Sequence, residues 1–454
     1  MSKLHELPLL YRLGKKYVLW VYRHYYSEYI LLGEENMTPA GEPVIYAPNH
    51  QNALMDSIGI LSLPPFDLAK IYLSRADLFN LPAPLVKFIK FAKLIPAYRI
   101  RDGYENLGKN KASFDDADQV LLNNAALVIM PEGNQAEEKK IRPLAKGIFR
   151  IALSAQEKMP AGKTVYIQPI GIDMGDLIKC GKHLIINIGK PIAVADFMEL
   201  YTENQSRAIN HLKSRLKTDM DQLIQNLDTE NYYETFETAI DASASAVLKK
   251  EQLRNDTINR FQTGQVTASK LVELEKNDLP AMQHLDQLCK LYRKTIEQFN
   301  LRTSNLEQSL PNSHSKLNSQ ILLNKVLFTP GYLLNLLPAL FVRNSPRLLG
   351  IEYIGFYSSA YYGASLLMYP LFYSLQSLLI VWFTPLSGIS FLILLILHYY
   401  SGKYSFHLYK KIKALKASKR LLNLSTDQPA ELAYLRELKS QITDIVLALP
   451  RKKA

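Results

Sequence analysis

The chain has 454 residues, more than one hydrophobic core usually supports, so we expect a catalytic domain with additional helical parts. Its 54 Lys and Arg against 42 Asp and Glu give a formal net charge of +12, which favours an anionic partner such as a phosphorylated substrate, nucleic acid or an acidic lipid surface. The two cysteines, Cys180 and Cys289, are too few for a disulfide framework or a cysteine-based metal site, so a reducing compartment is expected.

The N-terminal residues lack the apolar stretch and the cleavage site of a secretory signal. Residues 17–32 instead mix aromatic with basic side chains, which is typical of a helix at a bilayer interface. We therefore assign residues 1–28 to an interfacial amphipathic helix. An amphipathic helix packed on the following domain is an equally open interpretation.

Residues 29–197 alternate short apolar or β-branched runs with longer segments of helical period. This rhythm predicts an α/β domain with a mostly parallel sheet covered by helices. The expected strands are 44–48, 70–74, 94–98, 126–130, 165–172 and 183–189.

Residues 198–320 form a helical region by their apolar periodicity, with breaks expected at 263–264 and 277–278. The pattern leaves open whether these helices cover the α/β domain or form a separate bundle.

Residues 321–405 are expected to be embedded in a membrane, because no Asp, Glu, Lys or Arg occurs from 353 to 402. The pattern predicts a transmembrane helical hairpin with spans at 364–383 and 389–400. The run at 326–342 is shorter and is interrupted by Pro330 and Gly331, so we expect it to be re-entrant or interfacial. A buried apolar helical core is the alternative.

Basic residues flank this hairpin on both sides, which predicts that both flanks face the cytoplasm and that residues 406–454 form a basic cytoplasmic helical tail. They are Arg343 and Arg347 before it, and Lys403, Lys410, Lys411, Lys413, Lys416, Lys419 and Arg420 after it.

Polar residues follow the expected strands, where open α/β sheets bind their ligands. His50 and Asp56 follow the first strand. A histidine can take a proton from an attacking hydroxyl near neutral pH while a carboxylate fixes its tautomer. On a continuous helix the two residues would lie about 120° apart, so the chain after His50 must begin outside a helix if they touch.

Two further strand ends carry candidate binding residues. Arg99 and Arg101 share a face if their strand continues, and can present guanidinium groups to a phosphate. Glu132 precedes Gly133, where a tight turn can bring backbone close to a ligand. Glu132 can either bind an acceptor hydroxyl or brace its loop.

The sequence contains no Gly-x-Ser-x-Gly, His-Glu-x-x-His or Gly-x-x-x-x-Gly-Lys motif, and neither cysteine is near these residues. Direct attack by a histidine-activated hydroxyl is therefore a simpler scheme than a covalent acyl-enzyme.

Four blocks occur in order: NHQNALMD at 49–56, IPAYRIRD at 95–102, VIMPEGNQ at 128–135 and YIQPIGI at 166–172. In these blocks the chain resembles the lysophospholipid and glycerol-phosphate acyltransferase superfamily, in particular its 1-acylglycerol-3-phosphate acyltransferases. The resemblance covers roughly residues 25–195.

The resemblance implies that His50 is the base and Asp56 its partner, that Arg99 binds the acceptor phosphate, and that Glu132 and Gly133 belong to the acceptor site. The segment after the third block makes Lys146 a secondary phosphate or donor candidate. His50 and Asp56 have five residues between them where the common pattern has four. This spacing resembles a branch of fungal-type glycerol-3-phosphate acyltransferases and keeps the acceptor open.

We therefore expect an acyltransferase at the cytoplasmic face of a membrane that takes a fatty acyl group from acyl-carrier protein or acyl-coenzyme A. The leading acceptor is 1-acylglycerol-3-phosphate and the alternative is glycerol-3-phosphate. No cofactor or metal is expected. A non-catalytic membrane protein that binds lipid or partners is the competing hypothesis, and nucleic-acid binding is disfavoured because the basic residues adjoin apolar spans.

Overall fold

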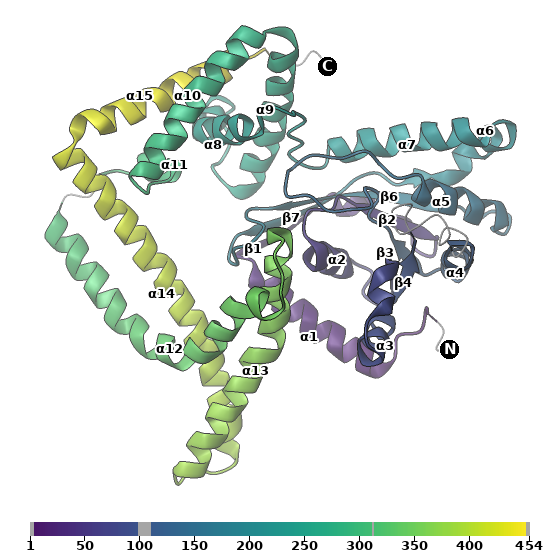
Figure 1. The fold of residues 1–454 in the computed structure, drawn as a ribbon, viewed down its shortest axis with the longest axis horizontal. Helices are drawn as coiled ribbons and strands as arrows, with labels where there is room; N and C mark the ends of the chain where they lie inside the picture. Colours follow the sequence, from purple (N-terminus) through teal and green to yellow (C-terminus); the bar gives the residue numbers. More distant parts are fainter. Residues whose placement is uncertain (1–3, 99–109, 311–312, 451–454) are drawn as a thin grey trace. The chain divides into compact units, whose positions relative to one another are not determined.

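The computed structural model describes the chain except for residues 1–3, 99–109, 311–312 and 451–454 (Figure 1). The chain divides into two units. The first unit contains Met1–Asn226 together with Ile351–Ser359, and the second contains Leu227–Gly350 and Ala360–Ala454.

The first unit is built on a mixed sheet that runs in the order β1-β7-β6-β2-β5-β3-β4, with β8 paired to β6. All pairs along this order are parallel except β6 with β7, and β8 is also antiparallel to β6. The mostly parallel sheet is thus confirmed. The strands are β1 Glu28–Leu32, β2 Val44–Pro48, β3 Lys70–Arg75, β4 Leu94–Ala97, β5 Ala126–Val128, β6 Tyr166–Met174, β7 His183–Ile188 and β8 Ile192–Ala193.

Successive side chains of the central strands point to opposite faces of the sheet. On β2, Ile45 and Ala47 join the main core, which α4, α5 and α7 complete. Tyr46 lies between these two residues in sequence and is also buried, but it does not belong to that cluster. Because both faces are covered, the strand reads as a continuous apolar run. The helices that follow the strands on this side are α4 Asn110–Leu122, α5 Gly147–Lys158, α6 Met198–Glu203 and α7 Gln205–Asp221.

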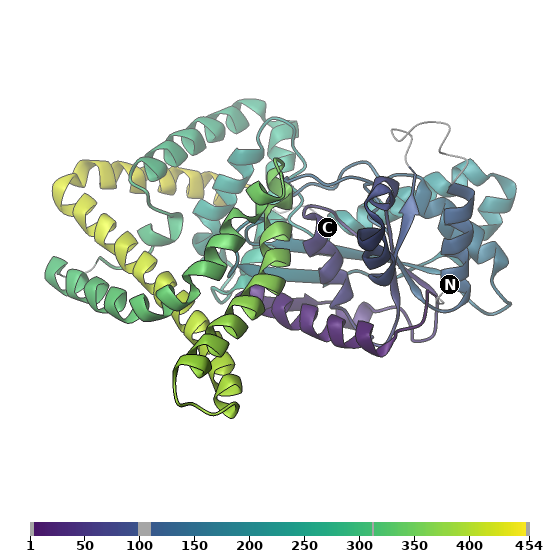
Figure 2. The same cartoon turned by 60° about the horizontal axis from the view of Figure 1, so that its bottom comes forward.

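The other face is covered by α1 Leu9–Tyr25 and α2 Ala53–Leu61, and α3 Ala83–Phe91 lies near them (Figures 1 and 2). The Tyr22 hydroxyl donates to the Met55 carbonyl at 2.8 Å, and the Tyr72 hydroxyl donates to the Ser57 carbonyl at 3.0 Å. Tyrosines from α1 and β3 therefore hold the start of α2, the helix that carries Asp56, in place.

The observed N-terminal helix ends earlier than the expected one. Helix α1 stops at Tyr25, and Glu28–Leu32 forms β1, which pairs in parallel with β7. The aromatic residues of this segment suit either a helix or a strand, and the pairing with residues 183–187 selects the strand.

The second unit has its own helical core, formed by α8 Tyr233–Lys250, α9 Thr257–Asn277, α10 Leu279–Gln298 and α15 Pro429–Ala448. The expected break at 263–264 is wrong, because α9 runs through it. The expected break at 277–278 is confirmed, since α9 ends at Asn277 and the Asp278 side chain caps α10 by accepting from the Ala281 amide. The region after residue 197 is thus divided: α7 covers the sheet and α8–α10 form a separate bundle.

The second unit also contains long apolar helices. Among the described residues, two helical segments are long and apolar enough to cross a membrane, His314–Leu348 and Ile354–Phe383. The first is α12, a single helix of 35 residues that continues through Pro330, so the short interrupted run expected there is wrong. The second contains α13, Tyr357–Phe383. The expected second span, 389–400, is helical and forms the start of α14, Ile389–Asp427, which continues into the basic segment.

A buried polar group joins these three helices. Asn335 on α12 accepts from the Tyr373 hydroxyl of α13 at 2.6 Å and donates to the Ser401 hydroxyl of α14 at 3.3 Å. In both views α13 and the start of α14 run side by side (Figures 1 and 2). Such hydrogen bonds between helices hold apolar helices together where hydrophobic burial cannot. The remaining short helices are η1 Glu34–Asn36, η2 Ala76–Asn80, η5 Val194–Phe197, α11 Thr303–Leu306 and η6 Ile354–Phe356.

Candidate active site

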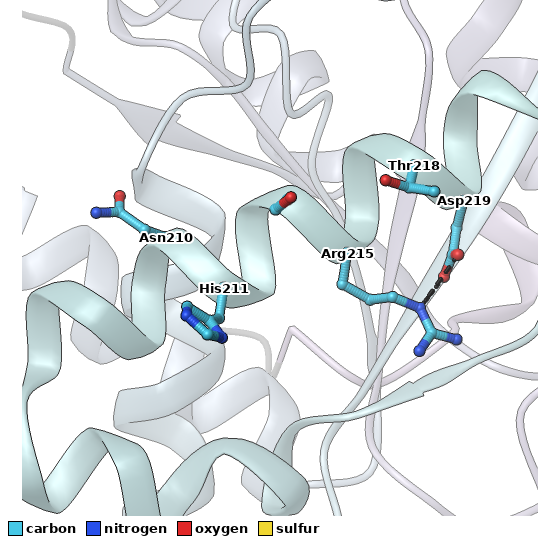
Figure 3. Close-up of a pocket in the computed structure, with 6 residues that line it drawn as sticks. Asn210, His211, Arg215, Thr218 and Asp219 are labelled. Atoms are coloured by element: carbon cyan, nitrogen blue, oxygen red, sulfur yellow. Dashed lines mark hydrogen bonds and ion pairs between the residues drawn. The ribbon is translucent and has the colours of Figure 1, made fainter.

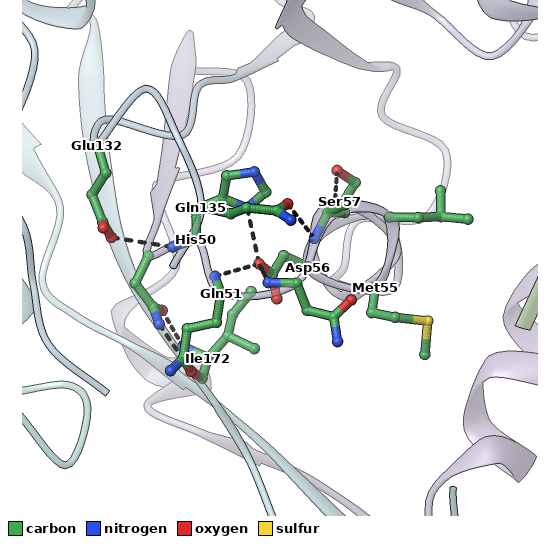
Figure 4. Close-up of polar contacts among 12 residues, drawn as sticks. His50, Gln51, Met55, Asp56, Ser57, Glu132, Gln135 and Ile172 are labelled. Atoms are coloured by element: carbon green, nitrogen blue, oxygen red, sulfur yellow. Dashed lines mark hydrogen bonds and ion pairs between the residues drawn. The ribbon is translucent and has the colours of Figure 1, made fainter. Parts of the chain in front are cut away.

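His50 and Asp56 touch. The His50 Nδ1 lies 2.9 Å from Asp56 Oδ2, with the carboxylate buried and the imidazole about one-sixth exposed (Figure 4). Helix α2 begins only at Ala53, so the residues after His50 are outside a helix, as contact between the pair requires. The loop turns the His50 ring back over the first turn of α2.

Asp56 Oδ2 is the centre of this loop. It accepts the backbone N–H of Gln51 at 2.8 Å and of Asn52 at 2.7 Å, in addition to its contact with His50 (Figure 4). Two backbone donors and the start of a helix both stabilise a negative carboxylate. An ionised Asp56 in turn selects the His50 tautomer that carries its proton on Nδ1.

The other ring nitrogen of His50, Nε2, is then a proton acceptor. In the part of the chain that the structure describes, no protein group is hydrogen-bonded to it. A carboxylate on one ring nitrogen and an open acceptor on the other is the arrangement of a general base.

Glu132 lies beside the same loop because β5, which precedes it, is the parallel neighbour of β2. Its Oε1 accepts the His50 backbone N–H at 3.1 Å (Figure 4). Its carboxylate also pairs with Arg142. Burial raises the pKa of Glu132, and the Arg142 guanidinium opposes that rise. In this structure Glu132 braces the loop, which is one of the two roles that its sequence position allows.

Arg142 is a site residue that the sequence reasoning missed. Its guanidinium donates to the His50 carbonyl at 3.0 Å and to both the backbone and the side-chain oxygen of Asn134. Together with Glu132 it clamps both backbone groups of His50, the N–H and the C=O. Arg142 lies ten residues after Glu132, so no short sequence motif links the two residues. Only its place in the segment after the third block indicated that it could lie near the site.

Two flanking residues fix the ends of the loop. Asn49 uses its side chain to pair with the backbone of Ile172 on β6, donating at 3.1 Å and accepting at 2.6 Å. Gln135 accepts the Ala53 backbone N–H at 3.1 Å, which satisfies a donor at the start of α2. The loop is therefore anchored to the sheet on one side and to the third block on the other.

The remaining predicted residues are placed as follows. Gly133 has φ +72°, a left-handed conformation that favours glycine, although a Cβ there would make only an ordinary van der Waals contact with the Ala145 Cβ at 3.9 Å. Lys146 is exposed and occupies the N-cap position of α5, without a side-chain hydrogen bond to the helix. Arg99 and Arg101 lie outside the described residues. Of the predicted residues that are described, the structure brings His50, Asp56 and Glu132 together.

A surface depression elsewhere in this unit, lined by α7 residues, contains none of these side chains (Figure 3). Its residues are Asn210, His211, Ser214, Arg215, Thr218 and Asp219. They come from a single helix, and Arg215 is paired with Asp219 at 2.9 Å (Figure 3). Over the described ranges, no group of three or more His, Cys, Asp or Glu side chains is arranged to hold a metal ion.

The chain was compared with known protein families, solved structures and curated sequences. Residues 30–173 match the family model described as Acyltransferase. The matched range includes His50, Asp56, Glu132 and Arg142. Among solved structures the chain is similar to the 1-acyl-sn-glycerophosphate (LPA) acyltransferase, PlsC, from Thermotoga maritima. That match has 17% identity, covers 45% of this chain and 80% of the other, and has a TM-score of 0.29. No match was found among curated protein sequences.

Proposed function

We propose that this chain, an acyltransferase by its family domain at residues 30–173, transfers a fatty acyl group from an acyl thioester to the free hydroxyl of 1-acylglycerol-3-phosphate. The observation that carries the proposal is the His50 ring, which holds Asp56 on one nitrogen at 2.9 Å and leaves the other open. The donor would be acyl-carrier protein or acyl-coenzyme A.

In the proposed reaction the acceptor hydroxyl gives its proton to His50 Nε2 as its oxygen attacks the thioester carbonyl. A C–O bond forms, the C–S bond breaks, and the departing thiolate takes the proton back from His50. Asp56 would stabilise the imidazolium that exists between these two transfers. The reaction consumes no net proton and needs no covalent acyl-enzyme.

The acceptor phosphate is the second element of the proposal. We assign it to Arg99 and Arg101 on their sequence positions, with Lys146 as a further cation. Lys146 is supported by its place at the N-terminus of α5, where backbone N–H groups and the helix dipole also favour an anion. Glycerol-3-phosphate carries the same phosphate and is the alternative acceptor.

The membrane supplies the lipid acceptor in this proposal. If the two candidate spans, α12 and α13, both cross, the residues before His314 and after Phe383 lie on one side. We place that side in the cytoplasm, because α14 is strongly basic from residue 403 to residue 420. The basic residues are Lys403, Lys410, Lys411, Lys413, Lys416, Lys419 and Arg420. A soluble thioester and a membrane acceptor would meet there.

The test is acceptor-dependent release of thiol from an acyl thioester by the full chain in detergent micelles, with 1-acylglycerol-3-phosphate and glycerol-3-phosphate as separate acceptors. We expect turnover with the first, and a loss of about 10²–10⁴-fold in kcat for His50→Ala, the usual contribution of a general base. His211→Ala, on the surface of α7, is the matched control and should retain full activity.

Full activity of His50→Ala would overturn the mechanism. Turnover with glycerol-3-phosphate alone would change the acceptor. Lipid binding without turnover across a panel of thioesters would overturn the proposed reaction and leave a lipid-binding protein.

A further inference from the structure

The loop of the candidate base is held by a segment that lies about three hundred residues further along the chain. Asn52 is fully buried in this loop, and its side-chain amide donates to the Ser358 hydroxyl at 2.6 Å. The same amide donates to the Leu177 carbonyl at 2.8 Å. Its oxygen accepts from the Ser359 hydroxyl at 3.2 Å, so both ends of the Asn52 amide are occupied.

Ser359 makes a second contact with the start of α2. The Leu54 backbone N–H donates to its hydroxyl oxygen at 3.2 Å. This N–H is one of the first four of the helix, which have no partner within the helix itself. Ser359 therefore acts as an external cap of the helix that carries Asp56.

These contacts reach His50 through a short chain of hydrogen bonds. Asn52 donates its backbone N–H to Asp56 Oδ2 at 2.7 Å, and the same oxygen contacts His50 Nδ1 at 2.9 Å. A rotation of the Asn52 peptide would remove one of the donors that fix Oδ2. The orientation of the His50 ring therefore depends on the two serine hydroxyls.

The segment is seated close to the site at a second point. Gly355 is buried, and a Cβ there would lie 2.6 Å from the Tyr353 ring and 3.3 Å from Gln135 Nε2. Gln135 in turn accepts the Ala53 N–H at 3.1 Å. The residues 351–359 thus approach the start of α2 both directly and through Gln135.

We propose that Ser358 and Ser359 are positioning residues for acyl transfer, which hold Asp56, and through it His50, by way of Asn52. The proposal rests on the function proposed above. Both serines lie outside residues 30–173, the range of the family match, and they form part of the first turn of α13, one of the two segments long and apolar enough to cross a membrane. The geometry of the base is therefore set in part by the point at which this helix begins.

The test compares the double variant Ser358→Ala/Ser359→Ala with Ser365→Ala in the full chain in detergent micelles. Ser365 is the matched control, because it lies on the same helix and its hydroxyl donates to the Tyr361 carbonyl of that helix at 2.7 Å. We expect kcat to fall about tenfold or more in the double variant, since small misplacements of a reacting group have effects of this size, with the acceptor KM nearly unchanged. Ser358→Thr, which keeps a hydroxyl, should recover most of the activity.

A spectroscopic readout makes the test independent of turnover. The His50 ring resonance, assigned by its absence from His50→Ala, should be displaced in the double variant and unchanged in Ser365→Ala. If the wild-type chain transfers no acyl group to any acceptor, the proposed function fails, and this resonance alone decides the positioning role.

An unchanged resonance with unchanged kcat, or an equal loss in Ser365→Ala, would overturn the inference. A rise in acceptor KM without a change in kcat would also overturn it, because it would place the serines in substrate binding. If the double variant does not fold, the single variants Ser358→Ala and Ser359→Ala, which each leave one hydroxyl on Asn52, are measured in the same way.

Discussion

At the residue scale, one oxygen of Asp56 organises the site. Oδ2 contacts the His50 ring and accepts hydrogen bonds from two backbone N–H groups. Oδ1 is buried and, among the described residues, has no hydrogen-bond partner. Hydrogen bonds to a charged group contribute about 1.5–3 kcal/mol each, so the three contacts favour this one orientation of the carboxylate. Burying Oδ1 without a hydrogen bond is unfavourable, and the contacts of Oδ2 that fix the His50 imidazole offset this.

The clamp formed by Glu132 and Arg142 gives the prediction at this scale. We expect Arg142→Met to lower kcat about tenfold or more, because the His50 backbone carbonyl then keeps only the Ala136 N–H of its two donors, and His50 shifts relative to substrate. Burial raises the pKa of Glu132, and Arg142 is the main group that opposes the rise. Removing that cation raises the pKa further, so Glu132 becomes neutral at a higher pH.

The measurement is the pH dependence of kcat/KM. A neutral Glu132 loses its pairing and weakens its contact with the His50 N–H, so the acid limb of the profile in Arg142→Met should move to higher pH. Glu132→Gln, which cannot ionise, should instead remove the contribution of Glu132 to that limb. Arg215→Met on α7 is the matched control, since it also removes an arginine paired with a carboxylate. An acid limb at the same pH in Arg142→Met and the wild type would contradict the assigned clamp.

Sequence reasoning reached the site residues that follow predicted strands and lie in the recognised blocks. His50 and Asp56 follow the first predicted strand, and Glu132 follows the fourth, whereas the contact of His50 with Asp56 and the pairing of β5 with β2 are seen in the structure. Arg142 and Ser358 carry no such signal. An arginine and a serine are common on surfaces, and only the tertiary fold brings them to His50 and Asn52.

At the element scale, the strands of the sheet were predictable because a parallel, doubly covered sheet makes each central strand a short apolar run. The first strand was not, since β1 pairs with β7, more than 150 residues away in sequence, and nothing local distinguishes its residues EYILL from the end of the preceding helix. Pro330 led to the opposite error, because its position predicts an interruption of a helix that in fact continues. Helix α12 continues through it, as apolar helices can when neighbouring helices satisfy the freed backbone groups.

The packing of α12 on α14 gives the prediction at this scale. Gly331 approaches α14 so closely that a Cβ would lie 2.0 Å from the Ser405 hydroxyl oxygen and 3.0 Å from the Ser401 carbonyl oxygen. The hydroxyl can rotate away but the carbonyl cannot, so Gly331→Ala should destabilise the second unit by about 1–3 kcal/mol, the usual cost of overpacking.

The measurement is thermal unfolding in detergent micelles, with Gly363→Ala on α13 as the control. A Cβ at Gly363 would meet nothing within 4 Å. That change should be neutral or stabilising by up to about 1 kcal/mol, because alanine favours a helix over glycine. Equal effects of the two substitutions would show that α12 and α14 do not pack as described.

At the scale of the whole molecule, the chain combines a net charge of +12 with two apolar segments, α12 and the segment that contains α13. Both attract a membrane, but by different forces. Attraction between exposed basic residues and anionic lipids falls with salt, since the Debye length is only about 3 Å at 1 M. Burial of apolar helices in lipid does not depend on salt in this way.

We therefore expect the full chain to stay in the membrane fraction of cells washed with about 1 M salt, where charges are screened, and to leave it only in detergent. The chain with residues 314–400 deleted should be released by salt, because only its basic surface and the apolar side of α1 remain. Release of the full chain by salt alone would show that α12 and α13 do not enter the membrane.

The return of residues 351–359 to the first unit also sets an order of events during synthesis. Chains are made from the N-terminus, and domains begin to fold as they emerge. Every strand of the described sheet is complete once residue 193 is made, but Asn52 has no hydroxyl partner before residues 358 and 359 appear. By then all of α12 has been synthesised. A nascent chain would therefore complete the hydrogen bonds of the His50 loop only after its first apolar helix has been made.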